Sequence, residues 1–184
     1  MEVLDGQGNV SIFEFASNSN LGNFQSSRKE TPLKDLKIAT AIPKGNRLDF
    51  YLQKLTEIGT TEIYFVEFER SVRNTISESR CSRILEEACI QSRRYFLPKI
   101  SFCKSWKEIP NLQDLVVFMP EGALFSKENW KPNLVPLVGP EGGFSPKELE
   151  EFSREGLEQF RLPTPILRIE TAGIYLVSIG SCLG

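Results

Sequence analysis

From residue 36 onward, short apolar runs alternate with segments of helical spacing, and this alternation limits the possible folds more than any other feature. The runs that predict buried strands are LKIATAI (36–42), EIYFVEF (62–68), KISFC (99–103), DLVVFMP (114–120), NLVPLVG (133–139) and QFRLP (159–163). Strands that alternate with helices are typical of a mostly parallel sheet. We therefore predict an α/β fold.

Helices are predicted between and after these strands. The first begins after Asn46, which can cap a helix, and ends at Gly59, which suits a left-handed C-cap. A second helix is expected over residues 77–94. The sequence S-P-K-E at Ser145 predicts a third, because the serine and the glutamate three residues later can form a capping box. The last helix is expected from about Glu170 onward.

The first 36 residues lack this alternation. The turn-forming sequence DGQGN (5–9) precedes one apolar run, VSIFEF (10–15), and polar residues with turn formers then dominate. We expect a strand or hairpin here, followed by a linker.

The 184 residues contain no histidine, which excludes Ser-His and Cys-His nucleophile pairs and histidine-ligated metals. The 4 cysteines include no C-x-x-C pair, so zinc-site spacings are absent and buried, reduced thiols are expected. No apolar run approaches the roughly 18 residues of a membrane span. The N-terminus has no secretory features, so we expect a cytoplasmic protein with no membrane span and no metal.

Positive charge is concentrated in the middle of the chain, although the formal net charge is -2. Residues 37–104 hold twelve Lys and Arg against eight Asp and Glu. A polyanionic partner would meet this region first, at Lys44, Arg47, Lys54, Arg70, Arg73, Arg93 and Arg94. Solvated helix faces would give the same modest excess of charge.

Two strand-to-helix junctions carry the candidate chemistry. The first is the glycine-rich loop GPEGGF (139–144), which differs from both the dinucleotide fingerprint and the P-loop. Its glycines would let backbone amides approach a ligand at a strand end, and a tight structural turn would need the same glycines. The second junction, ILRIETAG (166–173), holds Arg168, Glu170 and Thr171. A junction without a functional role would explain these residues equally well, because an acid is favoured at a helix start and the arginine could simply be exposed.

Four blocks of the sequence together resemble one family closely. They are PKGNRLDFYLQKLTEIGTTEIYFVEFERSVRN (43–74), EEACIQSRRYFLPKI (86–100), LVGPEGGFSPKELEEF (137–152) and LPTPILRIETA (162–172). These blocks are similar, in the same order, to those of the 16S ribosomal RNA (uracil-N3)-methyltransferases, members of the SPOUT, or trefoil-knot, superfamily. The resemblance extends from about residue 36 to the end, and GPEGG followed by LR-x-ETA is specific to it.

The resemblance implies a SPOUT-type parallel sheet whose C-terminal segment threads through a loop to form a deep trefoil knot. It also implies that S-adenosylmethionine is held in a bent shape by three loops at the knot. The residues carried over for this role are Met119, Pro120, Gly139, Pro140, Glu141, Gly142, Gly143, Leu162, Leu167, Thr171 and Ala172. A homodimer packed through the knot region is implied too, with contributions from Ile174, Tyr175 and Val177.

Methylation of uracil N3 requires loss of a proton from an imide that is mostly protonated at neutral pH. We expect Arg168 to stabilise negative charge on the uracil oxygens, and Glu170 to orient Arg168 or to accept the proton. Arg70 is a second candidate for contact with that charge or with a neighbouring phosphate. Positions that match basic or polar residues of the family predict RNA contacts at Lys44, Arg47, Lys54, Gln91 and Arg94.

The N-terminal part departs from the family, whose members carry a longer β-barrel of the PUA type. Residues 1–15 resemble only the rear part of that barrel. We therefore divide the chain into a partial PUA-like segment with its linker (1–35) and a SPOUT methyltransferase domain (36–184). The expected function is methylation of uridine N3 in 16S ribosomal RNA, free or in the small ribosomal subunit. A non-catalytic RNA- or nucleotide-binding module, and a methyltransferase for another RNA uridine, remain open alternatives.

Overall fold

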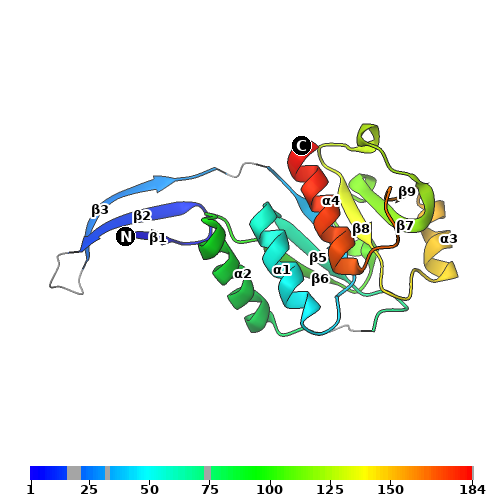
Figure 1. Cartoon of the computed structure of the whole chain (residues 1–184), viewed down its shortest axis with the longest axis horizontal. Coiled ribbons are helices and arrows are strands. Elements are labelled where there is room, and N and C mark those ends of the chain that lie inside the picture. Colours follow the sequence, from blue (N-terminus) through cyan, green and yellow to red (C-terminus); the bar gives the residue numbers. More distant parts are fainter. Residues whose placement is uncertain (16–21, 32–33, 73–75, 184) are drawn as a thin grey trace.

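The computed structural model describes residues 1–15, 22–31, 34–72 and 76–183. A 6-stranded parallel sheet forms the body of the molecule (Figure 1), with the strand order β6-β5-β4-β8-β7-β9. Its strands are β4 (Lys37–Thr40), β5 (Glu62–Val66), β6 (Lys99–Cys103), β7 (Leu115–Leu124), β8 (Val135–Val138) and β9 (Glu158–Arg161). The predicted α/β fold is confirmed, and each predicted strand of the body is present.

The strand order reverses at the centre of this sheet. From β4, the chain adds β5 and then β6 on one side, whereas β7, β8 and β9 lie on the other side. Every residue of β8 is buried, as are Ile38, Ala39 and Thr40 of β4. The two central strands therefore have the continuous apolar character of strands buried on both faces.

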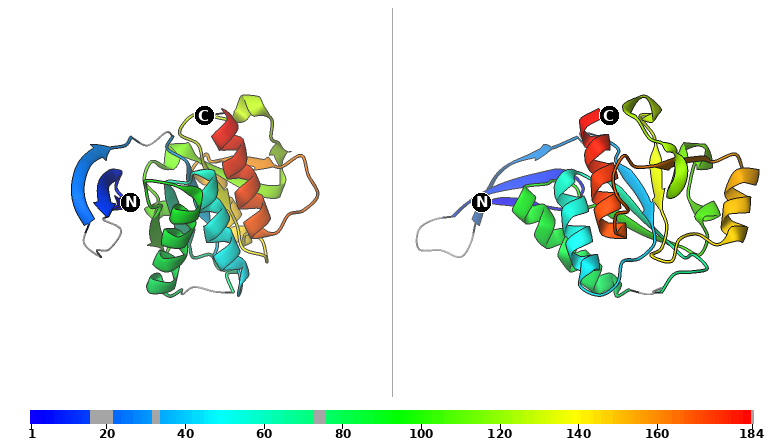
Figure 2. Two further views of the ribbon diagram at one scale, coloured as in Figure 1. Left: turned by 60° about the vertical axis from the view of Figure 1, so that its left-hand side comes forward. Right: turned by 45° about the vertical axis from the view of Figure 1, so that its right-hand side comes forward.

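Three long helices lie side by side on one face of the sheet (Figure 2): α1 (Arg47–Ile58), α2 (Glu78–Ser92) and α4 (Ile169–Leu183). The short helix α3 (Pro146–Arg154) lies apart from them, and its Phe152 ring packs edge-on against Trp106, with centroids 5.2 Å apart. Short 3-10 turns η1 (Trp106–Glu108), η2 (Leu112–Asp114) and η3 (Lys127–Asn129) complete the connections.

The predicted ends of α1 and the predicted start of α3 are correct, but one of the expected side-chain caps is absent. Gly59 has a φ of 115° and ends α1 by donating its N–H to Leu55 and Thr56 carbonyls. Ser145 and Glu148 form the predicted capping box of α3. The side chain of Asn46, in contrast, makes no capping hydrogen bond. Instead, the N–H groups of Arg47 and Leu48 at the start of α1 donate to the carbonyl oxygens of Lys44 and Gly45.

The N-terminal segment contains more strand than the sequence predicts. An antiparallel sheet is formed by β1 (Glu2–Leu4), β2 (Asn9–Phe15) and β3 (Gly22–Lys29). The strand β3 falls in the polar stretch that was expected to be a linker, of which residues 16–21 and 32–33 lie outside the described residues. Backbone pairing to β2 defines β3 while nearly all its side chains are exposed, so no apolar alternation marks it in the sequence.

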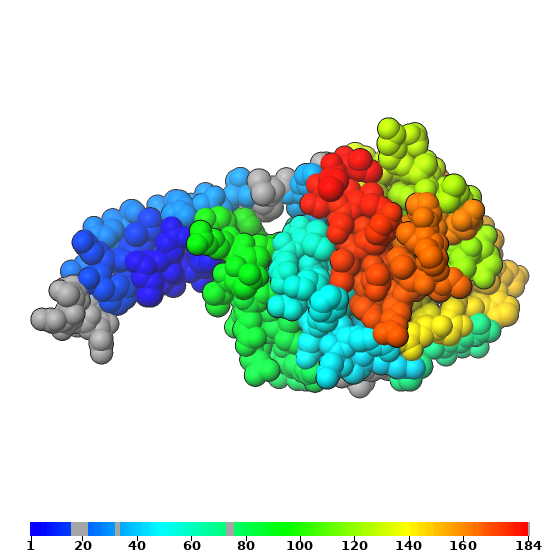
Figure 3. Space-filling model, in the orientation of Figure 1, coloured from blue at the N-terminus to red at the C-terminus, as the bar shows by residue number. Residues whose placement is uncertain are grey.

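The small N-terminal sheet projects from the body as an arm, which Figure 3 shows in blue beside α2. The turn between β1 and β2 contacts the body through its backbone. Gly8 N–H donates to the Tyr95 carbonyl at 3.0 Å, and Leu97 N–H donates to the Gly6 carbonyl at 2.9 Å. A Cβ on either glycine would overlap Leu97 or Phe96, so this turn docks closely. Arg28 of β3 adds a side-chain contact, because its guanidinium lies over the Tyr95 ring.

One residue expected at a subunit interface lies in the core instead. Val177 of α4 is 2% exposed because it packs within its own chain. It is therefore unavailable for the contact that was expected of it. Tyr175, on the neighbouring face of α4, is 36% exposed.

Candidate functional site

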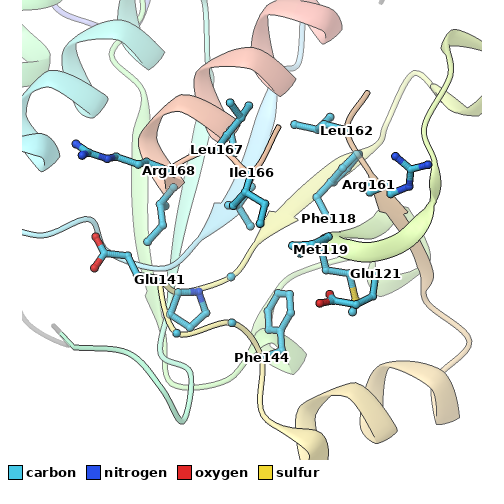
Figure 4. Close-up of a pocket in the computed structure, with 18 of the residues that line it drawn as sticks. Phe118, Met119, Glu121, Glu141, Phe144, Arg161, Leu162, Ile166, Leu167 and Arg168 are labelled. Atoms are coloured by element: carbon cyan, nitrogen blue, oxygen red, sulfur yellow. The ribbon is translucent and has the colours of Figure 1, made fainter. Parts of the chain in front are cut away.

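A cavity of about 1150 Å³ opens where β7, β8 and β9 end (Figure 4). Three segments supply most of its walls: residues 118–121 after the first half of β7, residues 138–144 after β8, and residues between 161 and 169 after β9. The cavity lies beside the point at which the strand order reverses. Open α/β sheets bind ligands at this position, outside the carboxyl ends of their strands.

The glycine-rich loop forms the floor of the cavity as a tight turn. Gly143 has a φ of +69°, and its N–H donates to the Pro140 carbonyl at 2.9 Å. A Cβ on Gly139 would lie 2.7 Å from the ring of Phe144. The glycines thus make the tight turn that was considered from the sequence, and they line the cavity, while the approach of their backbone to a ligand stays a prediction.

Arg70 is bound to the backbone of this loop. Its guanidinium Nη1 donates to the carbonyl oxygens of Gly142 and Phe144, each at 3.2 Å. The adjacent Glu69 N–H donates to Glu148 of the α3 capping box at 2.9 Å. Arg70 lines the cavity, and its expected contact with uracil charge or a phosphate stays a prediction.

Glu141, in the centre of the loop, is held by two cations. Lys44 Nζ lies 2.9 Å from one carboxylate oxygen, and Arg47 Nη2 lies 2.5 Å from the other. Hydrogen bonds from the two cations lower the pKa of Glu141 below its ordinary value, and the bond from Lys44 has the larger effect. The carboxylate therefore stays ionised and fixed to the start of α1.

Arg47 also reaches the start of α4. Its Nη1 lies 3.7 Å from Glu170 Oε1. Glu170 is only 6% exposed, and its Oε2 has no hydrogen-bond partner among the described residues. Glu170 does not line the cavity, and its side chain lies beside Arg47 instead.

The third wall is apolar. Leu162, Ile166 and Leu167 face the cavity opposite Phe118 and Met119 in Figure 4, and Ile166 is 85% exposed. Arg168 stands at the end of this wall, is exposed, and points away from Phe118. An uncovered apolar wall beside exposed backbone is typical of a ligand site.

The first wall results from an irregularity in β7. Phe118 and Ala123 both pair with Phe160 of β9, so residues 119–122 loop out toward the cavity. At Gly122 the two backbones nearly touch, since a Cβ there would lie 2.4 Å from the Phe160 carbonyl carbon. This glycine was not singled out from the sequence, because only the pairing with β9 reveals its constraint.

Most of the predicted cofactor residues lie together. Those that line the cavity are Met119, Pro120, Gly139, Pro140, Glu141, Gly142, Gly143, Leu162, Leu167 and Ala172, with Arg70 and Arg168 beside them. Thr171 and Glu170 do not line it. Phe118, Phe144, Arg161 and Ile166 also line the cavity, although the sequence did not single them out for this role. Phe144 and Ile166 lie within the predicted loops, and Phe118 and Arg161 directly precede them.

The predicted RNA contacts do not form one surface of available cations. Lys44 and Arg47 are engaged by Glu141, and Lys54 Nζ donates to Glu57 at 2.8 Å. Arg94 is turned inward, where it donates to the Thr56 and Thr60 carbonyls at the end of α1. Gln91 is exposed on α2.

No helix within the described residues is long and apolar enough to cross a membrane. Across the same residues, no cluster of three or more His, Cys, Asp or Glu side chains is placed to hold a metal ion.

The fold and the cavity together define a class: an α/β protein with an open parallel sheet and a cavity at the point where the strand order reverses. The chain belongs to the family described as the RNA methyltransferase domain, whose model matches residues 29–181. The resemblance seen in the four sequence blocks is thus confirmed.

Individual relatives agree with this assignment. The chain is 35% identical over 144 residues to the ribosomal RNA small subunit methyltransferase E 2 of Borreliella burgdorferi, covering 72% of this chain and 59% of that protein. A probable rRNA-methyltransferase from Porphyromonas gingivalis has a similar structure, with a TM-score of 0.85 and 26% identity over 100% of this chain and 84% of that chain.

A further solved structure shares the fold. It is a ribosomal RNA small subunit methyltransferase E from Neisseria gonorrhoeae bound to S-adenosyl methionine, with a TM-score of 0.83 and 22% identity. The match covers 100% of this chain and 82% of that chain.

Proposed function

We propose that this chain is an S-adenosylmethionine-dependent methyltransferase that modifies N3 of a uridine in 16S ribosomal RNA. The observation that carries the proposal is the cavity made by three loops at the switch point, in a chain of the RNA methyltransferase family. The chain spans 59% of the length of its Borreliella burgdorferi relative, so activity, substrate and partners are proposed here for the chain itself.

The residues present fit S-adenosylmethionine. The cavity, at about 1150 Å³, has room for a nucleoside with an amino-acid tail. Adenine needs an apolar slot with backbone partners, which Phe118, Leu162 and Leu167 would supply beside the exposed backbone of loop 139–143. The cations beside that loop already have partners, since Arg70 donates to loop carbonyls and Lys44 and Arg47 pair with Glu141, so none of them is an unpaired charge facing a bound sulfonium.

When bound, the cofactor supplies an electrophilic methyl group. The chain itself must favour the deprotonated form of uracil N3, whose negative charge spreads over the two ring oxygens. Arg168 is exposed at the cavity edge, and no described side chain forms an ion pair with it, so its guanidinium is available to stabilise this charge. Glu170, buried beside Arg47, acts indirectly in this scheme.

We further propose that RNA is held at the rim of the cavity. Arg161, at the end of β9, lines the cavity, is exposed, and forms no ion pair within the described part of the chain. Together with Arg168 it offers two cations to phosphates that flank a bound uridine. Gln91, exposed on α2, stays a further predicted RNA contact, whereas Lys54 is paired with Glu57.

The remaining expectations from the family stand as parts of the same proposal. They comprise a PUA-like segment (1–35), a SPOUT domain (36–184) with a C-terminal knot, and a homodimer packed through α4, where Tyr175 is exposed. The close approach of the Gly122 and Phe160 backbones, where β7 pairs with β9, is the feature of the described C-terminal half that supports tight packing there. A ribosomal substrate would make the cytoplasm the site of action.

The direct test is mass spectrometry of 16S ribosomal RNA from cells with and without the protein. The proposal expects an N3-methyluridine that disappears on deletion and returns with the wild-type chain, but not with Arg168→Ala. If the nucleoside is unchanged while another RNA loses a methyl group, the enzyme acts elsewhere. No change in any RNA, despite normal expression, would favour a non-catalytic binding module.

A further inference from the structure

Arg47 occupies an unusual position for a helix-start residue. It is the first residue of α1, directly after the turn that follows β4, and it lines the cavity. Its side chain is 31% exposed and lies between two carboxylates from distant parts of the sequence. One belongs to the glycine-rich loop and the other to the first turn of α4.

The two carboxylates depend on Arg47 to different degrees. Glu141 has a second cation, Lys44, and its side chain is 30% exposed to water. Glu170 has a side-chain exposure of 7%, and among the described residues it forms its ion pair with Arg47. A buried carboxylate left without its cation is strongly destabilising, since it loses both hydration and charge compensation.

A guanidinium suits this position better than an ammonium. Its planar fork directs Nη1 toward Glu170 and Nη2 toward Glu141, so one side chain connects both segments. A lysine offers a single charged nitrogen and would have to favour one carboxylate. The loop and the start of α4 are two of the walls that would enclose the cofactor.

We propose that Arg47 is a positioning residue that clamps the glycine-rich loop to the start of α4 through Glu141 and Glu170, and so shapes the cofactor cavity. This inference rests on the proposed function for its ligand. It replaces the RNA contact predicted for Arg47 from the sequence with a role inside the protein.

The test compares Arg47→Met and Arg47→Lys with Lys54→Met, which removes a cation from the same helix where it pairs with Glu57. S-adenosylmethionine affinity is measured by calorimetry, RNA affinity by filter binding, and kcat and KM by methyl transfer. Arg47→Met should weaken cofactor affinity at least about tenfold and raise the cofactor KM more than it lowers kcat. Arg47→Lys should recover part of the loss. The RNA affinity of Arg47→Met should change less than about twofold. In Lys54→Met, the affinities for S-adenosylmethionine and for RNA should both change less than about twofold.

Hydrogen exchange without ligand separates this inference from the proposed function. In Arg47→Met, amides of residues 139–143 and 169–173 should exchange faster, while those of β5 and β6 stay protected. If the wild-type chain binds no cofactor, the proposed function fails, and exchange alone decides whether the clamp exists. Weakened RNA binding with unchanged cofactor affinity and unchanged exchange would overturn the inference and restore Arg47 to an RNA contact.

Discussion

At the residue scale, the site is organised by arginines with different neighbours. Arg70 is bound to loop carbonyls, Arg47 to two carboxylates, and Arg94 to the end of α1. Arg168 and Arg161 have no ion pair with any described side chain and stand at the cavity. By residue type alone, all five arginines are equal candidates for RNA contacts. Their partners distinguish them, because three are held by groups of the chain itself and two have charges that are free to meet RNA.

Replacing Arg168 by alanine tests the proposed charge stabilisation. Methyl transfer should fall by roughly 100-fold or more, the usual effect of removing one donor to a developing anion. Cofactor affinity should stay within about threefold, because Arg168 points away from the apolar wall. Single-turnover kinetics and calorimetry measure the two quantities, with Arg154→Ala on α3 as an exposed-arginine control. Equal activity in the mutant would remove Arg168 from the mechanism.

The lowered pKa of Glu141 predicts how the stability of the protein changes at acid pH. Because Lys44 and Arg47 lower that pKa in the folded protein, the ionised carboxylate contributes stability above the ordinary pKa of about 4.5. This contribution is lost as the pH falls through the lower, folded-state value. The melting temperature of Glu141→Gln should therefore lie below that of the wild type at pH 7, and the two should converge as the pH falls below 4.5 and through the folded-state value. A difference that does not shrink as the pH falls through the acid range would contradict this account.

At the element scale, the cavity depends on the pairing of β7 with β9, because the shift in register leaves residues 119–122 looped out beside the cavity. Gly122→Ala would place a methyl group 2.4 Å from the Phe160 carbonyl carbon, which is backbone and has little freedom to move. We expect the free energy of unfolding to fall by about 1–3 kcal/mol, together with weaker cofactor binding. Urea titration measures the first effect. The control is Ala123→Ser, at the neighbouring exposed position. Equal stability of both variants would argue against the close contact between the Gly122 and Phe160 backbones.

The capping box of α3 gives a second prediction at this scale. Ser145 accepts a hydrogen bond from Glu148 N–H at 3.3 Å and donates its own N–H to Glu148 at 2.7 Å. Ser145→Ala should cost about 1 kcal/mol of stability, and Ser145→Asp should cost less. Thermal unfolding of the three proteins checks this order. A loss as large with aspartate as with alanine would mean that capping is not the cause.

The sequence predicts regular elements well and long-range constraints poorly. Hydrophobic spacing located the body strands, and the S-P-K-E pattern located the start of α3, because both signals are local. The strand β3 was missed because its side chains are polar and only its backbone pairing makes it a strand. Glu170 was placed beside Arg168 by adjacency in sequence, whereas folding brings it to Arg47, more than one hundred residues away in the chain.

At the scale of the whole molecule, the chain combines a slender N-terminal arm with a body that holds the cavity (Figure 3). The formal net charge is -2, so RNA affinity must come from local groups of cations rather than from the total charge. The rim arginines are the described cations best placed at the cavity. The cations of α1 and its preceding turn are already paired with acids of the chain itself.

The salt dependence of RNA binding tests this distribution of charge. The logarithm of affinity should fall linearly with the logarithm of salt concentration, and Arg161→Ala should reduce the slope by nearly one. Lys54→Met, whose lysine pairs with Glu57, should change the slope little. Filter binding with a 16S ribosomal RNA fragment at several salt concentrations gives both slopes. A larger effect from Lys54 than from Arg161 would move the RNA surface from the cavity rim to α1.

The central claim is that three loops at the switch point form a binding site for S-adenosylmethionine. Isothermal titration of the wild-type chain with this compound measures that most directly, with ATP as a nucleotide control. We predict saturable heat with one site per chain, and none with ATP. Absence of heat, together with no rise in melting temperature when the protein is folded, would contradict the account.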